Sequence, residues 1–298
     1  MPKTSDILEQ DIFDKSSELL DCLLIDRTKT TARKVHNIIW ANDNYENLGK
    51  GYSATAEMTS EAVRAQNSRL IRPRALKEKD LQKKRTKEHA EVFTPSWIVD
   101  KQVSACEESC KKLPLRDYVS KLWMEITSGE APYIANRYEM DTGELIAIPK
   151  RVGFLDRKLR RINSEVDSKE EWNVLVRLAY KSTYGFEWSG DSLLLARENI
   201  LYTFVDYYED KWESSPSVDE MLEVAEIISY NIFQMDGLKL QIPLSEKETV
   251  KSEEYEDIDI FGNVTIKTKQ VKTKKPGKPA KIMDWKSGKM IEFARVGR

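Results

Sequence analysis

The stretch YGFEWSGDSLLLARENILYTF, residues 184–204, decides how this chain is expected to fold. A short apolar run from Thr183 to Trp188 carries a carboxylate, Glu187, near its end, and a helical pattern of apolar residues follows. This pattern predicts a strand, a sharp turn and a helix. In open α/β sheets, ligands bind outside the carboxyl ends of strands, where an acidic residue often accepts ribose hydroxyls. We therefore expect Glu187 to bind a nucleoside. The alternative is that Glu187 is simply one of the fifty acidic residues of the chain, exposed on the surface without a binding role.

Two further apolar runs predict neighbouring strands. Leu122 to Ile126 leads into a glycine turn at Gly129, and Asn231 to Met235 ends at Asp236-Gly237. A continuous helix capped by the glycine fits the second run almost as well. Amphipathic or capping patterns predict helices over residues 5–25, 55–90 and 168–181 and from Ser217 onward.

Composition limits the class of protein. The chain has 298 residues, 40% hydrophobic and 33% charged, enough to bury the core of one large domain or two small ones. Three cysteines without CxxC spacing and only two histidines offer no zinc site and no disulfide framework. No apolar run approaches the roughly 20 residues that span a bilayer, and the acidic N-terminus lacks a signal-peptide pattern. We therefore expect a soluble cytoplasmic protein without a metal or a membrane partner.

Basic residues are concentrated locally, although the formal net charge is only −2. Three basic segments are candidate phosphate contacts, although such runs are more often solvated surfaces: residues 72–87, 150–161 and 267–281. The last segment follows an acidic stretch and contains seven lysines and no acid. It is too polar to pack, so we expect a mobile loop there. Ser287-Gly288 then predicts the turn of a closing hairpin.

Four separated motifs follow one another along the chain: EVFTPSWIV (residues 91–99), EITSGEAPY (125–133), YGFEWSGDSLLLARENIL (184–201) and NIFQMDGL (231–238). In this order they resemble the FTPxxLV, DPxCGxGxF, IYGxExxxxxxxLARxNL and NIxxGDxL elements of bacterial adenine-specific DNA methyltransferases. The resemblance is strongest to the small methylase-like subunits of restriction–modification systems and covers about residues 85–240. Ala131 stands where the family has the second glycine of its loop.

The resemblance implies an α/β fold with a Rossmann-like sheet that binds S-adenosylmethionine. Glu187 would bind the ribose hydroxyls, Trp188 would lie beside the adenine ring, and Asp236 would accept a hydrogen bond from the adenine amine. The FTP element would line the methionine end of the cofactor. The cofactor-binding residues implied in this way are Phe93, Thr94, Pro95, Glu125, Ile126, Gly129, Tyr133, Glu187, Trp188 and Asp236.

One element of the family is missing. Adenine methyltransferases carry a [DNS]PP[YFW] loop that holds the flipped target base, and this chain has no Pro-Pro dipeptide. Another subunit could supply that loop. Alternatively the motif order is permuted, because a polar turn that ends in an aromatic follows the apolar run Val35 to Trp40. The candidate catalytic residues are then Asn42, Asp43, Asn44 and Tyr45, with Asn42 on the target amine and Tyr45 stacked on the base.

The sequence leaves several functions open. A DNA adenine methyltransferase of a restriction–modification or phage-defence system is our main expectation, with DNA as partner. A non-catalytic methyltransferase-like subunit that binds cofactor or DNA is the alternative, with a second restriction–modification subunit or a second copy as partner. In that case the 42–45 segment is an Asn/Asp-rich turn. A PD-(D/E)xK nuclease would use Asp284 and Lys286 with Asp257 or Asp259, although the Ser-Gly hairpin turn already explains that motif.

The chain is expected to divide into three regions. Residues 1–90 form a helical and strand region that contains the 42–45 loop and a basic helix. Residues 91–245 form the methyltransferase-like core. Residues 246–298 form a charged loop and a C-terminal hairpin.

Overall fold

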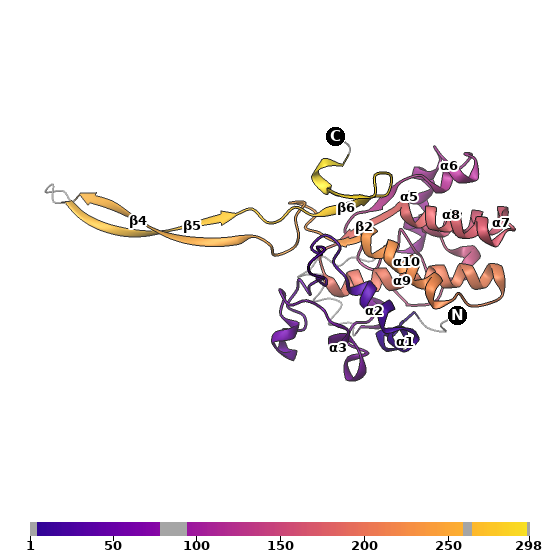
Figure 1. Cartoon of the computed structure of the whole chain (residues 1–298), viewed down its shortest axis with the longest axis horizontal. Helices are drawn as coiled ribbons and strands as arrows, with labels where there is room; N and C mark the ends of the chain where they lie inside the picture. Colours follow the sequence, from indigo (N-terminus) through magenta and orange to yellow (C-terminus); the bar gives the residue numbers. More distant parts are fainter. Residues whose placement is uncertain (1–4, 78–93, 259–263, 297–298) are drawn as a thin grey trace.

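The computed structural model describes residues 5–77, 94–258 and 264–296. It contains a parallel sheet of three strands in the order β1, β2, β3, surrounded by helices (Figure 1). The strands are β1 (Trp123–Glu125), β2 (Thr183–Glu187) and β3 (Ile232–Gln234). All three predicted strands are therefore confirmed, and the alternative of a continuous helix through Asn231 to Met235 is wrong. The protein is a mixed α/β protein.

Helices connect the strands, as parallel pairing requires, because consecutive strands of the sheet run in the same direction. The connection from β1 to β2 contains α7 (Phe154–Glu165) and α8 (Lys169–Lys181). The connection from β2 to β3 contains α9 (Gly190–Trp212) and α10 (Val218–Asn231). Ser217 and Glu220 form the capping box that the sequence predicts at the start of α10.

The N-terminal region differs from its prediction. The single helix expected over residues 5–25 is two helices, because Ser16 adopts an extended conformation with φ −165° and ψ 127°. The single helix expected over residues 55–90 is wrong for its described part, where Ala65 has a left-handed φ of 56° and only a four-residue helix and short 3-10 turns form. Residues 78–90 lie outside the described part of the chain. The remaining α-helices of the described residues are α1 (Glu9–Lys15), α2 (Ser17–Leu24), α3 (Ser60–Val63), α5 (Ser96–Glu107) and α6 (Leu115–Val119).

The apolar run Val35 to Trp40 lies against β3 without joining the sheet. The side-chain amide of Gln234 donates to the Ile39 carbonyl at 2.8 Å and accepts from the Ile39 N–H at 3.0 Å. Ile39 also forms an isolated bridge with Glu57. The Gln234 side chain thus forms the two hydrogen bonds to Ile39 that a strand of the sheet would form with its backbone if residues 35–40 were a fourth strand.

The C-terminal hairpin covers one face of the sheet. β6 (Lys281–Asp284) and β7 (Lys289–Glu292) pair antiparallel, with Gly288 in the turn at φ +66°, so the predicted hairpin is confirmed. Ile282 packs with Tyr184, Phe186 and Phe233 from the central strands in a small apolar cluster. Helix α9 contacts β2 and β3 and belongs to the main core.

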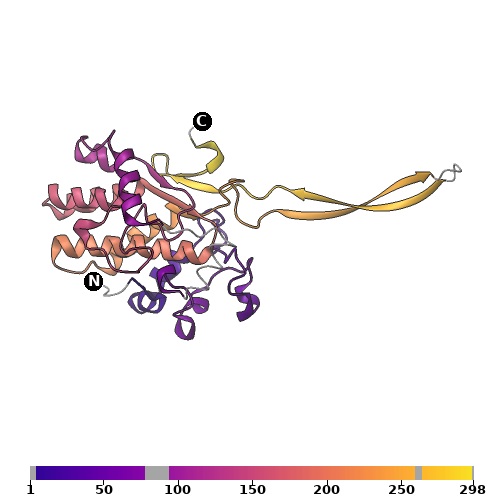
Figure 2. The ribbon, with the colours of Figure 1, turned by 180° about the vertical axis from the view of Figure 1, so that it is seen from behind.

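The acidic stretch and the lysine tract form a long arm (Figures 1 and 2). β4 (Lys247–Ile258) and β5 (Val264–Lys275), of 12 residues each, pair antiparallel and project away from the body. The mobile loop predicted for this tract is therefore wrong. Two strands satisfy each other's backbone groups without a packed face, and opposite charges meet across them, as in the ion pair Lys274–Glu248 at 3.7 Å.

Replacing Gly190 with alanine tests the docking of the 38–41 segment on α9. The new Cβ would lie 2.2 Å from the Ile39 carbonyl oxygen and 2.7 Å from the Met58 sulfur. We expect the free energy of unfolding to fall by about 3 kcal/mol, measured by urea denaturation. The matched control is Gly51→Ala, whose Cβ would meet nothing within 4 Å and should change stability by less than about 0.5 kcal/mol. Equal effects of the two substitutions would contradict this docking.

Candidate functional site at the carboxyl ends of the strands

Glu187 joins the ends of two strands. At the end of β2, its carboxylate accepts from the Gly129 N–H at 2.8 Å and from the Ser189 N–H at 3.1 Å. Gly129 belongs to the loop that follows β1, so one side chain fixes the distance between that loop and the turn after β2. Burial raises the pKa of Glu187, these backbone N–H groups oppose the rise, and the nearby Asp191 adds to it.

Glu125, at the end of β1, also accepts hydrogen bonds from backbone N–H groups of the loop that follows β1. Its two oxygens accept from the backbone N–H groups of Tyr133 at 3.2 Å and Ile134 at 3.0 Å, which closes the loop 126–134 back on its own strand. Burial raises the pKa of Glu125 to about 8, and the negative charge of Glu187 contributes to this rise. The two predicted cofactor carboxylates are therefore electrostatic neighbours.

The loop between these carboxylates repeatedly adopts left-handed backbone conformations. Thr127, Gly129 and Ala131 have φ values of 48°, 53° and 62°. A Cβ on Gly129 would meet no atom within 4 Å, so the backbone there borders open space beside Glu187. Ala131 adopts the conformation that glycine allows at lower cost.

The 42–45 segment lies at the same end of the sheet. The Trp188 indole donates to the Ala41 carbonyl at 2.6 Å, and the Gly190 N–H donates to the Trp40 carbonyl at 3.0 Å. Asp191 accepts from the Asn42 amide at 3.1 Å and from the Tyr45 hydroxyl at 2.8 Å. The fold thus brings together groups that are about 150 residues apart in the sequence.

The predicted catalytic residues differ in exposure. Asn42 and Tyr45 are buried, and their polar groups bind Asp191. Asp43 is exposed. The Asn44 Nδ2 atom is buried and has no hydrogen-bond partner among the described residues. The loop therefore keeps one unsatisfied buried donor.

The remaining predicted cofactor residues are dispersed around this site. Asp236 follows β3, but its carboxylate accepts from the backbone N–H groups of Leu238 at 2.9 Å and Lys239 at 3.0 Å, which stabilises its own turn. Ile126 is 68% exposed. Tyr133 donates from its hydroxyl to Gln102 of α5. Thr94 and Pro95 precede α5, and Phe93 lies outside the described residues.

Three polar residues at this end of the sheet were not predicted. Asp191 anchors the 42–45 segment, and Gln234 anchors Ile39. Ser128, in the loop after β1, has a buried hydroxyl without a hydrogen-bond partner among the described residues. A glutamine inside the apolar run NIFQM and an acid in the first turn of a helix were the available signals.

One predicted phosphate-binding segment is occupied by internal contacts. Arg151 pairs with the buried Asp206 at 2.7 Å, and Arg157 pairs with Asp100 at 2.7 Å. Lys158 is 1% exposed, donates to the Ser182 hydroxyl at 2.8 Å, and has a pKa lowered to about 7 by burial. Residues 150–161 therefore hold helices together and do not present a free cationic surface.

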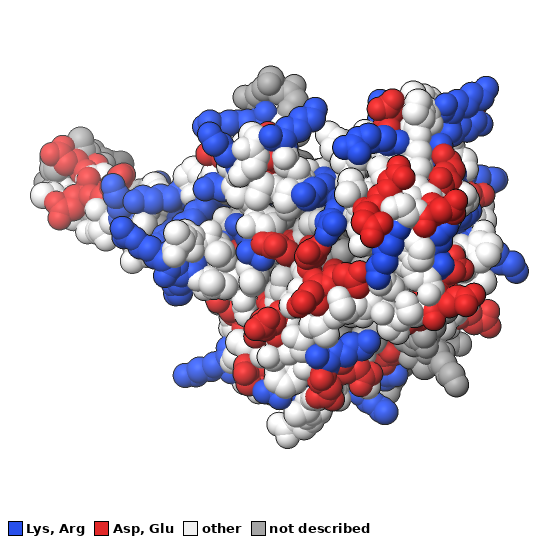
Figure 3. Space-filling view, turned by 45° about the vertical axis from the view of Figure 1, so that its right-hand side comes forward, with Lys and Arg blue, Asp and Glu red and all other residues white. Residues whose placement is uncertain are grey.

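The third basic segment is accessible. Its described lysines are exposed where the arm meets the body, and Figure 3 shows basic side chains on this part of the arm. They are Lys269, Lys272, Lys274, Lys275, Lys278 and Lys281. In the first basic segment, Arg74 is buried and Arg72 lies 3.6 Å from Asp6, while residues 78–87 lie outside the described part.

The nuclease arrangement is not assembled among the described residues. Asp284 accepts from the Lys286 N–H at 3.0 Å and from the Ser287 hydroxyl at 2.7 Å, as a hairpin turn requires. Asp257 lies near the far end of the arm, and Asp259 is outside the described residues. In the described part of the chain, no three His, Cys, Asp or Glu residues group as a metal site would require.

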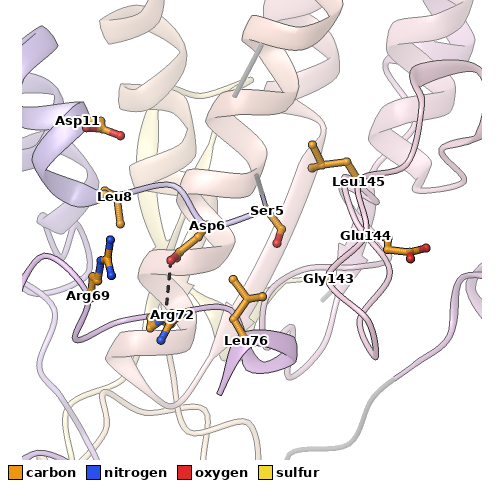
Figure 4. A pocket seen from close by; sticks show the side chains of 10 residues that line it. All are labelled: Ser5, Asp6, Leu8, Asp11, Arg69, Arg72, Leu76, Gly143, Glu144 and Leu145. Atoms are coloured by element: carbon orange, nitrogen blue, oxygen red, sulfur yellow. Dashed lines mark ion pairs between the residues drawn. The ribbon is translucent and has the colours of Figure 1, made fainter. Parts of the chain in front are cut away.

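The two recorded cavities lie elsewhere. A cavity of about 680 Å³ is lined by residues of both charges, among them Asp6, Arg69, Arg72 and Glu144 (Figure 4). A second, of about 330 Å³, is lined by four arginines of residues 151–161 and by Asp100 and Glu107, the acidic partners of Arg157. Neither includes a predicted cofactor or catalytic residue.

Comparisons with protein-family models, curated proteins and solved structures found no match to this chain. Among the described residues, no helix has both the length and the apolar character needed to cross a membrane.

The raised pKa of Glu125 predicts a pH-dependent stability. A carboxyl that stays protonated in the fold up to about pH 8, against 4.5 in the unfolded chain, stabilises the fold most at low pH. That contribution is fully present below about pH 4.5 and is lost progressively as the pH rises to about 8. We expect Glu125→Gln, whose amide nitrogen cannot accept from a backbone N–H, to be less stable than wild type at pH 5. The difference should shrink toward pH 8, by at most about 1.4 kcal/mol per pH unit. If urea denaturation gave the same difference in unfolding free energy between wild type and Glu125→Gln at every pH from 5 to 8, the assignment would be contradicted.

Proposed function

We propose that this chain binds S-adenosylmethionine at the carboxyl ends of β1 and β2 and methylates adenine in DNA. The observation that carries the proposal is the hydrogen bond from Gly129 to Glu187, which joins a glycine loop after β1 to an acidic residue after β2. In Rossmann-like sheets, this combination of a close backbone approach and a carboxylate binds nucleosides. The Rossmann-like methyltransferase fold is part of the proposal.

Several features of the residues present fit this cofactor. Gly129 borders open space, and the Ser128 hydroxyl is a buried group without a partner among the described residues. Burial raises the pKa values of Glu125 and Glu187, and no cationic side chain is among the groups that oppose this rise. A cationic sulfonium would supply positive charge beside them. When bound, the cofactor would supply the activated methyl group.

The protein side of the reaction is assigned to the 42–45 segment. In the proposal, Asn42 accepts from the exocyclic amine of adenine and the Tyr45 ring stacks on the flipped base. The assignment is supported by the hydrogen bonds of both residues to Asp191, in the first turn of the helix that follows the proposed ribose ligand Glu187. Positioning of the amine would do most of the catalytic work, since no covalent intermediate on the enzyme is needed.

The same contacts favour a second candidate function. Asn42 and Tyr45 are buried and direct their polar groups to Asp191 and not to an open site. A methyltransferase-like subunit that binds cofactor and DNA without transferring the methyl group would keep this arrangement unchanged. Measurements of cofactor binding and of methyl transfer distinguish the two candidates.

DNA binding is assigned to the exposed lysines at the base of the arm. Lys272, Lys275 and Lys278 are exposed, in contrast to the paired basic residues of segment 150–161. Cationic contacts to phosphates release counterions, so the affinity of the protein for DNA would fall steeply with salt.

The cofactor site is tested by two glycine substitutions with matched backbone strain. Gly129 and Gly288 have φ values of +53° and +66°, and a Cβ on either would meet nothing within 4 Å. Both alanine variants should lose about 1 kcal/mol of stability. Only Gly129→Ala should weaken S-adenosylmethionine binding in calorimetry, by about tenfold or more, because its methyl group would occupy the open space beside Glu187. Equal affinities of the two variants would exclude this site.

Methyl transfer to bulk bacterial DNA tests the role of the 42–45 segment. We expect Asn42→Ala and Tyr45→Ala to lower the transfer rate by about 100-fold while S-adenosylmethionine affinity is retained. Tyr45→Phe keeps the ring but loses the bond to Asp191, so it should retain more activity than Tyr45→Ala if stacking matters. Glu46→Ala, an exposed neighbour, is the control. Cofactor binding by wild type without transfer above background would support the non-catalytic subunit instead.

A further inference from the structure

The arm formed by β4 and β5 has no packing partner among the described residues. The described side chains from Lys247 to Glu256 are exposed except Thr249, which is half-buried, and no described strand pairs with the outer edge of β4 or β5. At about 3.4 Å per residue, the 12-residue strands extend about 40 Å from the body. A two-stranded ribbon is only marginally stable alone, and unpaired strand edges attract other strands. We therefore expect another polypeptide strand to pair with an edge of the arm.

Charge is unevenly distributed along the arm, with two exceptions: Glu248 lies near the body, opposite Lys274, and Lys269 lies opposite Glu253. The acidic side chains Glu253, Glu254, Glu256 and Asp257 lie toward its far end, whereas Lys247, Lys251, Lys272, Lys274 and Lys275 lie toward the body. Figure 3 shows this change from acidic to basic along the arm. The acidic end opposes insertion into a nucleic-acid groove. It is complementary to the basic half of another arm that runs in the opposite direction.

We infer that the arm is a self-association element, in which the outer edges of β4 from two copies of this chain pair antiparallel about a two-fold axis at Ser252. In this register Lys247 lies opposite Asp257, and Lys251 lies opposite Glu253. Glu248 lies opposite Glu256, but Glu248 is already paired with Lys274 of its own arm at 3.7 Å. Opposite-charge pairs across strands stabilise a sheet, and like charges destabilise it.

The composition of β5 explains why β4 forms the interface. The described charged side chains of β5 are Lys269, Lys272, Lys274 and Lys275, so pairing two β5 edges would place lysines against lysines. Lysine on an edge strand is a common protection against further pairing. Pairing through β4 therefore leaves two lysine-rich β5 strands outside, and the assembly closes as a dimer.

The inference is independent of the proposed methyltransferase activity and is tested on the full chain. Sedimentation equilibrium should show a dimer for wild type. Lys247→Glu/Lys251→Glu makes the facing charges acidic, and Glu253→Lys/Asp257→Lys makes them basic, so each variant alone should dissociate about tenfold or more readily. An equimolar mixture of the two should form a heterodimer, because the facing pairs 247–257 and 251–253 then all have opposite charge. Glu18→Lys/Asp21→Lys, on exposed acids of α2, is the control and should remain dimeric.

Cysteine cross-linking tests the register. In a Cys106→Ser background, which removes the exposed native thiol, Ser252→Cys should form an intermolecular disulfide on mild oxidation, since the two residues face each other across the axis. Thr249→Cys lies opposite Tyr255 and should not cross-link.

Three outcomes would overturn the inference. They are a monomeric wild type at concentrations of about 100 μM, a dimer that both charge variants leave intact, and assemblies larger than a dimer. A monomer in which the lysine substitutions weaken only DNA binding would assign the arm to nucleic acid instead.

Discussion

Burial of the first five turns of α9 is the constraint on which the rest of the structure depends. Every residue from Gly190 to Tyr208 is buried, so a polar side chain on this helix is stabilised by a partner inside the protein, and Asp191, Arg197, Asn199 and Asp206 each have one. Arg197 donates to the carbonyls of Ile25 at 3.0 Å and Ile232 at 2.8 Å, and burial lowers its pKa to about 10. Asp206 accepts from Arg137 at 2.9 Å and from Arg151 at 2.7 Å.

These contacts tie separate parts of the sequence to one helix. Asn199 donates to the Glu130 carbonyl at 3.1 Å, which fixes the loop after β1, and Asp191 fixes the 42–45 segment. The candidate site is therefore assembled by buried polar bonds from α9 as much as by the sheet. Burial of an ion pair contributes little net stability but strongly penalises any arrangement that leaves one partner alone. This explains how polar contacts specify the position of the loops.

The predicted elements succeeded where local pattern and tertiary environment agree. The strand from Thr183 to Glu187, the capping box at Ser217 and the hairpin turn at Gly288 follow from apolar runs, short-range hydrogen bonds and a left-handed glycine. The predictions failed where a distant partner decides. The basic residues of segment 150–161 appear free in the sequence, yet acids from α5 and α9 neutralise several of them. The lysine tract was predicted to be a mobile loop because neither it nor its pairing partner β4 has the apolar residues that mark a strand in the sequence.

The sequence alone determined the three central strands, the carboxylates Glu125 and Glu187 at their ends and the glycine beside them, because these features depend on residues close in the chain. It also identified the 42–45 segment as a polar turn after an apolar run. Only the tertiary structure decided that this segment docks beside Trp188 and hydrogen-bonds to Asp191. It also decided that the Gln234 side chain, and not a paired backbone, holds Ile39 beside β3, and that two polar strands form an arm. Those choices depend on hydrogen bonds between residues far apart in sequence, and no local pattern encodes which distant group will satisfy a buried donor or acceptor.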